Sequence, residues 1–138
     1  MMGNADLVLK LLHLNGSAAF NRWAGFEIVS AEPGRVELRM GWKEEAGQYA
    51  GFLHAGLVGA MIDTTCGFAA FTQVGAVLAS HYSVNCMAPA VGRAFHCVGQ
   101  VVKAGKRQVF TRAELFAEAE DGTRKLVATG ETILMTAA

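Results

Sequence analysis

The sequence of 138 residues has little charge, only two prolines and three cysteines. Charged residues make up 17% of the chain, and 12 basic residues balance 12 acidic ones, so the formal net charge is zero. A chain without a basic excess has no general electrostatic attraction to nucleic acid, and we expect no such partner. A length of 138 residues predicts a single domain over residues 1–138 that can bury a core. With 52% hydrophobic residues, the composition gives no indication of a disordered tail.

The cysteines do not form a disulfide framework. Cys66, Cys86 and Cys97 are odd in number, widely spaced and set among apolar neighbours. This favours buried, reduced thiols and a cytoplasmic location. Together with His81 and His96 they show no paired ligand spacing, since adjacent residues 96 and 97 on a strand point to opposite faces. We therefore expect no metal site.

Hydrophobic runs are too short to predict a membrane span. A span needs ~18 to 20 uninterrupted apolar residues, and the closest candidate, residues 55–70, has Asp63 at its centre. Residues 1–14 lack the basic start and the small-residue cleavage site of a secretion signal. The sequence predicts neither membrane insertion nor secretion.

The first forty residues predict a helix followed by a hairpin. Leu7, Leu11 and Leu14 have helical spacing within residues 6–14, and residues 20–23 continue this helix or form a second turn. Residues 26–30 and 35–40 alternate between polar and apolar side chains around the turn Glu32-Pro33-Gly34. That pattern is typical of two strands with one solvated face.

The remaining sequence predicts a long helix and a run of strands. A polar loop, residues 42–53, precedes an apolar helix that ends near residue 75, and Asp121-Gly122 is a strong hairpin signal. The expected strands cover residues 76–87, 93–103, 108–119 and 126–135. In the third of these, one face carries Val109, Thr111, Ala113, Leu115 and Ala117. An antiparallel sheet and a helix that is apolar on nearly every face predict an α+β domain whose sheet wraps around that helix.

Asp63 is the one charged residue between Glu45 and Arg93, and it lies in the helix expected to be buried. Desolvating a carboxylate costs several kcal/mol or raises its pKa instead. One explanation is a satisfied core aspartate, hydrogen-bonded to Thr64, Thr65 or free backbone. The other is a functional acid.

The residues before Asp63 form a motif, Gln48-Tyr-Ala-Gly51-Phe-Leu-His54-Ala55-Gly56, with the acid nine positions after the histidine. It resembles the signature of the hotdog-fold acyl-CoA thioesterases, above all the phenylacetate-degradation (PaaI-like) branch. There, Asn or Gln, two residues, Gly, two residues and His-Gly-Gly precede an acid on the helix. Chain length, strand order and the Met-Ala-Pro-Ala turn at 87–90 extend the resemblance over the whole chain. The departures are Ala55 for the first glycine of His-Gly-Gly and Gln48 for the commoner Asn.

The resemblance implies hydrolysis of an acyl- or aryl-acyl-CoA, with CoA as part of the substrate and no separate cofactor. Asp63 is the expected general base or nucleophile, and Gln48 the residue that orients the water or the carbonyl. At the helix start, the backbone N–H groups of Ala55 and Gly56 are expected to form an oxyanion site, of the kind that contributes ~3 to 4 kcal/mol. Gly51 and Gly56 would let loop and ligand approach closely, although ordinary turn chemistry also explains glycine there.

His54 has two open interpretations: a helix cap that orients the loop or binds substrate, and a group that transfers a proton. Nine positions at ~100° per residue place His54 and Asp63 on opposite sides of one helix. If both act in one site, Asp63 must come from a second subunit whose helix runs antiparallel. This agrees with the dimer-interface sites that the resemblance implies, so we expect a homodimer, or a dimer of dimers.

Two further groups of side chains are candidates for substrate contacts. Hydroxyl groups that position water are expected among Thr64, Ser80 and Ser83. Cations that hold the phosphates of CoA cluster at one strand turn, as Lys103, Lys106 and Arg107. Structural hydroxyls and a solvated turn are the corresponding alternatives.

Two other functions stay open. A hydratase or dehydratase on the same scaffold would pair a histidine with an acid in a different pattern, which this sequence lacks. A non-catalytic acyl-CoA-binding protein would usually bring an additional regulatory segment, for which 138 residues leave no room.

Overall fold

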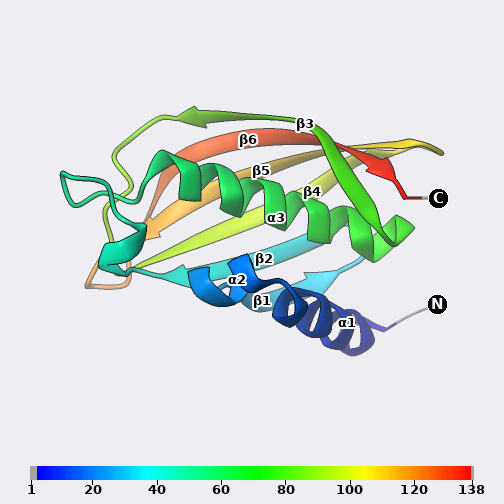
Figure 1. Ribbon diagram of the computed structural model, residues 1–138, viewed down its shortest axis with the longest axis horizontal. Helices are drawn as coiled ribbons and strands as arrows, with labels where there is room; N and C mark the ends of the chain where they lie inside the picture. Colours follow the sequence, from blue (N-terminus) through cyan, green and yellow to red (C-terminus); the bar gives the residue numbers. More distant parts are fainter. Residues whose placement is uncertain (1–2, 138) are drawn as a thin grey trace.

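The computed structural model describes residues 3–137. Helices α1 (Asn4–Ser17) and α2 (Ala19–Ala24) are followed by strands β1 (Glu27–Glu32) and β2 (Arg35–Gly41), the short helix η1 (Glu44–Ala46) and the long helix α3 (Ala55–Val74). The chain continues through β3 (Val77–Cys86), β4 (Ala94–Ala104), β5 (Gln108–Glu118) and β6 (Arg124–Thr136). All strand pairs are antiparallel, in the order β1-β2-β4-β5-β6-β3. Helix α3 lies along one face of this sheet (Figure 1), which confirms the expected architecture.

The N-terminal helical segment is longer than predicted and is broken at one residue. Ala18 has an extended backbone with φ −95° and ψ 120°, so α2 is a separate helix rather than a continuation of α1. Leu7 and Leu11 of α1 are buried. Leu14, which shares their spacing, is 37% exposed because α1 leaves a cavity beside it.

Helix α3 forms the centre of the core. Met61, Ile62 and Cys66 on this helix are fully buried. A close approach to the sheet is possible because Gly130 on β6 has no side chain: a Cβ there would lie 2.7 Å from Cγ2 of Ile62. Among the described residues, only α3 has the length and composition of a membrane span, a test that the core helix of a soluble protein also passes.

The strands show the predicted alternation. The five residues expected to share one face of β5 are all buried, and the residues between them are exposed or half-buried. Strands β5 and β6 are joined by the expected turn, where Gly122 has a φ of 88° and Oδ1 of Asp121 accepts a 3.0 Å hydrogen bond from the N–H of Thr123. The side chains that point away from α3 lie on the opposite side of the sheet, called here its outer face.

Strand β3 lies at an edge of the sheet and is mostly exposed. It pairs with β6 on one side, and it carries no Asp, Glu, Lys, Arg or Pro. Such an edge offers backbone N–H and C=O groups to another strand. Within residues 3–137, β3 has no pairing partner on its other side.

The three cysteines are free thiols, but they are not all buried. Cys66 and Cys97 lie in the core, and burial raises the pKa of both thiols. Cys86 is exposed at the end of β3, so the expectation of three buried thiols is wrong for this residue. The reason is that no other element within residues 3–137 covers the edge strand.

Candidate active site

The loop before α3 is held by hydrogen bonds between its own residues. The N–H of Gln48 donates to the carbonyl of Phe52 at 2.8 Å, and the N–H of Gly51 donates to the carbonyl of Gln48 at 3.2 Å. Gly51 has a φ of 82°, a conformation that glycine adopts at little cost. The side-chain oxygen Oε1 of Gln48 accepts from the N–H of Ala50. That hydrogen bond orients the side-chain amide of Gln48, whose N–H groups make no hydrogen bond within the described residues.

His54 is the N-cap of α3. Its Nδ1 accepts a 2.8 Å hydrogen bond from the N–H of Gly56, and its carbonyl accepts from Leu57 at 2.8 Å and Val58 at 3.1 Å. The structure therefore supports the cap interpretation. A neutral imidazole that accepts at Nδ1 carries its proton on Nε2, so the exposed ring presents a donor rather than a base.

The N–H groups at the start of α3 are not equivalent. The N–H of Gly56 is taken by His54, so the expectation of two free oxyanion donors does not hold in this structure. The N–H of Ala55 makes no hydrogen bond within residues 3–137, and Ala55 is exposed. The start of the helix therefore offers one backbone donor, together with the Nε2–H of His54.

Asp63 is half-buried rather than fully buried, because the face of α3 that carries it opens onto a cavity. Burial raises the pKa of its carboxyl group. Its carboxylate makes no hydrogen bond or ion pair within the described residues, and the Thr65 hydroxyl donates to the carbonyl of Met61 at 2.6 Å instead. A satisfied core aspartate is thus not what the structure contains.

The cavity beside Asp63 has a volume of about 390 Å³, which lies within the range of small-molecule sites. It is lined by Leu14, Ser17, Ala18 and Asn21 from α1 and α2, by Asp63, Thr64, Gly67, Phe68 and Phe71 from α3, and by Ala76, Val77, Leu78, Ala79 and Leu134. Most of these side chains are apolar or small. The cavity therefore offers a hydrophobic space next to a single carboxylate.

His54 and Asp63 do not meet within one chain. Nine residues of helix at ~1.5 Å each separate them by ~13 Å along the axis, and they face opposite sides. His54 lies at the exposed start of α3, whereas Asp63 faces the cavity near the middle of the helix. Within one chain, the histidine loop and the acid are therefore separate.

The remaining predicted residues lie apart from this cavity, Thr64 excepted. Ser80 lies at an irregularity in β3, and its hydroxyl donates to the carbonyl of Ile133 at 3.2 Å. Ser83 lines a groove on the outer face of the sheet instead. Within one chain, the structure brings neither serine to Asp63.

The cations predicted to hold phosphates are exposed. Lys103, Lys106 and Arg107 lie at or beside the turn between β4 and β5 and make no ion pair within the described residues. This turn lies at the end of the sheet opposite the loop over residues 42–53 (Figure 1). The basic turn is therefore remote from His54 of the same chain.

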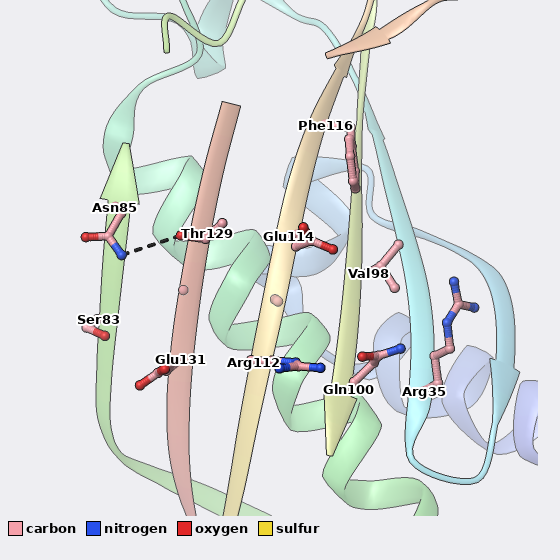
Figure 2. A pocket seen from close by; sticks show the side chains of 12 residues that line it. Arg35, Ser83, Asn85, Val98, Gln100, Arg112, Glu114, Phe116, Thr129 and Glu131 are labelled. Atoms are coloured by element: carbon pink, nitrogen blue, oxygen red, sulfur yellow. Dashed lines mark hydrogen bonds between the residues drawn. The ribbon is translucent and has the colours of Figure 1, made fainter. Parts of the chain in front are cut away.

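A larger groove, of about 720 Å³, lies on the outer face of the sheet (Figure 2). Arg35, Gln100, Arg112 and Glu131 lie opposite one another on neighbouring strands and cross it as a row. The groove is lined by acidic and basic side chains that lie opposite one another on neighbouring strands, and no residue of α3 lines it. We therefore take the smaller cavity, which holds the unpartnered carboxylate, as the candidate active site.

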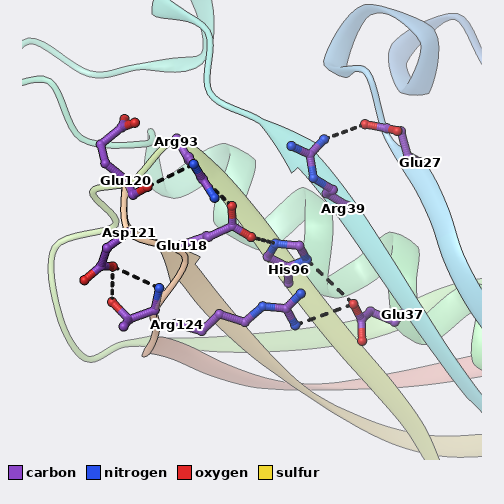
Figure 3. A network of polar contacts seen from close by, with 10 residues as sticks. Glu27, Glu37, Arg39, Arg93, His96, Glu118, Glu120, Asp121 and Arg124 are labelled. Atoms are coloured by element: carbon purple, nitrogen blue, oxygen red, sulfur yellow. Dashed lines mark hydrogen bonds and ion pairs between the residues drawn. The ribbon is translucent and has the colours of Figure 1, made fainter.

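A polar network near one end of the outer face was not predicted from the sequence (Figure 3). Nε2 of buried His96 lies 2.8 Å from Oε1 of Glu118, whose Oε2 lies 2.6 Å from Nε of Arg93. Oε2 of Glu37 lies 3.6 Å from both Nδ1 of His96 and Nη1 of Arg124. Arg93 and His96 hold the pKa of Glu118 below its usual value. Glu37, His96, Glu118 and Arg124 lie on four different strands, so no local sequence pattern predicts the network.

Over residues 3–137 there is no cluster of three or more His, Cys, Asp or Glu side chains that could hold a metal ion. Nε2 of His96 contacts Glu118 within the polar network.

Comparisons with known proteins agree on the fold. A crystal structure of a thioesterase family protein from Silicibacter pomeroyi is 34% identical, with a TM-score of 0.89 over 94% of this chain and 96% of that one. The PaaI protein of the E. coli phenylacetic acid degradation operon is 18% identical, with a TM-score of 0.86 over 99% and 97% of the two chains. Zebrafish thioesterase superfamily member 2 is 23% identical, with a TM-score of 0.82 over 99% and 100%. The latter two likenesses show the fold alone.

The family follows from a match in sequence. The thioesterase superfamily model matches residues 50–123, which contain the motif from Ala50 onward, all of α3 and strands β3, β4 and β5. No curated protein matches the chain. The six-stranded antiparallel sheet around α3 is the expected hotdog fold. This chain belongs to the thioesterase superfamily.

Proposed function

We propose that this protein hydrolyses an acyl- or aryl-acyl-CoA to the free acid and CoA, at a site shared by two subunits. The observation that carries the proposal is the half-buried carboxylate of Asp63, which has no partner within the described residues and faces a hydrophobic cavity. A carboxylate without a structural partner in such a cavity is a candidate catalytic group. Membership in the thioesterase superfamily supports hydrolysis of a thioester in general.

Asp63 supplies the base or the nucleophile. As a base, it takes a proton from water while the water oxygen bonds to the thioester carbonyl carbon; the C–S bond then breaks, and the CoA sulfur leaves and is protonated. As a nucleophile, its carboxylate oxygen bonds to the same carbon and expels CoA, and water then hydrolyses the mixed anhydride. In both cases the carbonyl oxygen gains negative charge in the transition state.

That charge is stabilised by donors at the start of α3 of the other subunit. The N–H of Ala55 is exposed and free within the described residues, and the Nε2–H of His54 is a second donor beside it. The amide N–H groups of Gln48 provide a third, orienting contact. Donors that are already oriented before the reaction stabilise the oxyanion without further reorganisation.

Dimerisation explains how the histidine loop and the acid meet. Strand β3 is an uncharged edge strand, and its first residues line the Asp63 cavity. Pairing of this edge with a second copy about a two-fold axis covers the edge and brings the partner helix antiparallel to α3. Each dimer then has two sites, and a dimer of dimers is the expected larger assembly. The phosphates of CoA bind at the basic turn of Lys103, Lys106 and Arg107.

Thiol release from a panel of acyl-CoAs tests this function. Acetyl-, hexanoyl-, decanoyl- and phenylacetyl-CoA are supplied in turn to the wild-type protein and to Asp63→Asn, and free thiol is measured. Release by the wild type that is lost in Asp63→Asn supports the proposal. Binding of these thioesters without release indicates an acyl-CoA-binding protein. An enoyl-CoA is supplied in a separate assay, where its conversion without thiol release indicates a hydratase. Sedimentation of the active protein as a monomer at micromolar concentration would contradict the shared site.

A further inference from the structure

The wall of the Asp63 cavity opposite α3 is formed by residues 14–21, where α1 ends and α2 begins. We call this segment the corner between α1 and α2. Leu14, Ala18 and Asn21 of this corner line the cavity together with Phe68 and Phe71 of α3. Helix α1 packs against β1 rather than against α3. The corner therefore stands off from α3 and leaves the space beside Asp63 open.

Local hydrogen bonds hold this corner in place. Nδ2 of buried Asn15 donates to the carbonyl of Phe26 at 2.8 Å, and its Oδ1 accepts from Nδ2 of Asn21 at 3.0 Å. Nη1 of Arg22 donates to the carbonyl of Gly16 at 2.9 Å, which ties α2 to the end of α1. The corner is thus a defined wall rather than a loose segment.

We propose that this corner sets the size of the acyl group that the enzyme accepts, and that Ala18 is the residue that limits it. The inference rests on the function proposed above. Leu14, Phe68, Phe71 and Leu134 give the cavity hydrophobic walls, which favour an alkyl or aryl acyl group over a charged one. Each methylene that reaches such walls improves binding roughly fourfold. An acyl group too large for the space between the corner and α3 gains nothing and is excluded.

Ala18 suits this role because it can change size without changing the backbone. Its φ of −95° and ψ of 120° lie in the extended region, which any L-residue adopts. Its N–H and carbonyl bond to Asn15 and Arg22 through the main chain, so a larger side chain breaks neither bond. Added atoms at this position enter the cavity that the residue already lines.

The test compares Ala18→Leu with Ala19→Leu, an exposed neighbour that does not line the cavity. Ratios of kcat/KM for decanoyl- and phenylacetyl-CoA relative to acetyl-CoA are measured for both variants and the wild type. Ala18→Leu is expected to lower these ratios at least tenfold, and Ala19→Leu to leave them within twofold. Equal ratios in all three proteins, or the same change in both variants, would overturn the inference.

A second pair of variants changes the wall in the other direction. Leu14→Ala enlarges the cavity and is expected to raise the ratio of decanoyl- to acetyl-CoA at least threefold, whereas Leu12→Ala, on the exposed side of α1, leaves it unchanged. An unchanged ratio in folded Leu14→Ala contradicts the inference even if Ala18→Leu fails to fold. A wild-type protein that releases thiol from no acyl-CoA refutes the proposed function itself, which separates the two failures.

Discussion

Nδ1 of His54 accepts a 2.8 Å hydrogen bond from the N–H of Gly56, two residues later at the start of α3. A Cβ at Gly56 would lie 2.9 Å from this same nitrogen, closer than real Cβ contacts allow. The missing side chain at position 56 therefore lets the imidazole cap the helix. The cap fixes which ring nitrogen carries the proton and leaves Nε2–H as the donor for a ligand.

Gly56→Ala should displace the ring of His54 and weaken the oxyanion site. We expect kcat to fall about tenfold or more, since a misplaced donor stabilises the transition state less. The measurement is steady-state thiol release together with a melting curve. Gly16→Ala is the matched control, because a Cβ at Gly16 meets no atom within 4 Å. Full activity in Gly56→Ala would show that the position of the ring does not matter for the reaction.

Asp63→Asn removes the charge and keeps the shape of the side chain. We expect kcat to fall by ~10² or more, as the loss of a base or a nucleophile does. The melting temperature at neutral pH should stay the same or rise, because burial raises the pKa of Asp63 and its ionised form therefore destabilises the folded state. Protonated Asp63 adds its full contribution to the free energy of unfolding below the pKa of the unfolded state. That contribution is lost as the pH rises through the pKa of the folded state.

The difference in melting temperature between Asp63→Asn and the wild type should therefore shrink as the pH falls below the unfolded pKa of about 3.9, where Asp63 is protonated in both states. Asp6→Asn, an exposed acid on α1, is the control and should alter neither kcat nor stability appreciably. Near-normal kcat in well-folded Asp63→Asn protein would remove Asp63 from the chemistry.

The pH dependence of hydrolysis should report the raised pKa of Asp63. Because the reaction needs the ionised carboxylate, kcat/KM rises with pH, and its acid limb has a midpoint above the ordinary value of about 3.9. A thioester of a short thiol without phosphates is the best substrate, since a phosphate group itself titrates near pH 6. A midpoint at or below the ordinary value means that the acid in the reaction is not this half-buried one.

Mixing two inactive variants should restore activity if each site combines two subunits. Asp63→Asn supplies an intact loop, and the double variant Gln48→Ala with His54→Ala supplies an intact acid. After complete random exchange, half of the dimers are mixed and each has one intact site of two, so about a quarter of wild-type activity returns. The double variant must first be shown to be nearly inactive. No recovery despite verified exchange would place both groups in the same chain's site.

Glu118→Gln should destabilise the fold without touching the reaction. Arg93 and His96 lower the pKa of Glu118, so this residue contributes stability above its unfolded pKa, and that stability is lost as the pH falls through the folded pKa. We expect a lower melting temperature at pH 7 and a gap that closes in acid. Glu114→Gln, an exposed change on the same strand, should have little effect. An equal melting temperature at pH 7 would mean that the network adds no stability.

Local pattern was sufficient for most of the fold. The alternation along β5 predicted its buried face residue by residue, and Asp121-Gly122 predicted the turn to β6, because both depend on side chains a few positions apart. The apolar run from residue 55 predicted the central helix for the same reason. The motif from Gln48 to Gly56, together with Asp63, pointed to the thioesterase superfamily.

Tertiary structure decided which residues contact one another and which side chains face the cavity. The pairing of β3 with β6 shifts by one residue between Ala79 and His81. An extra residue in one strand turns the side chains that follow it to the other face of the sheet. Ser83 consequently lies on the outer face, away from Asp63. The His96–Glu118 contact joins β4 to β5, and the cavity joins the α1–α2 corner to the middle of α3. Which side chains meet across such separations depends on packing directions that sequence spacing does not encode. The sequence therefore determined the elements and the acid, and only the folded chain decided the partners and the space around that acid.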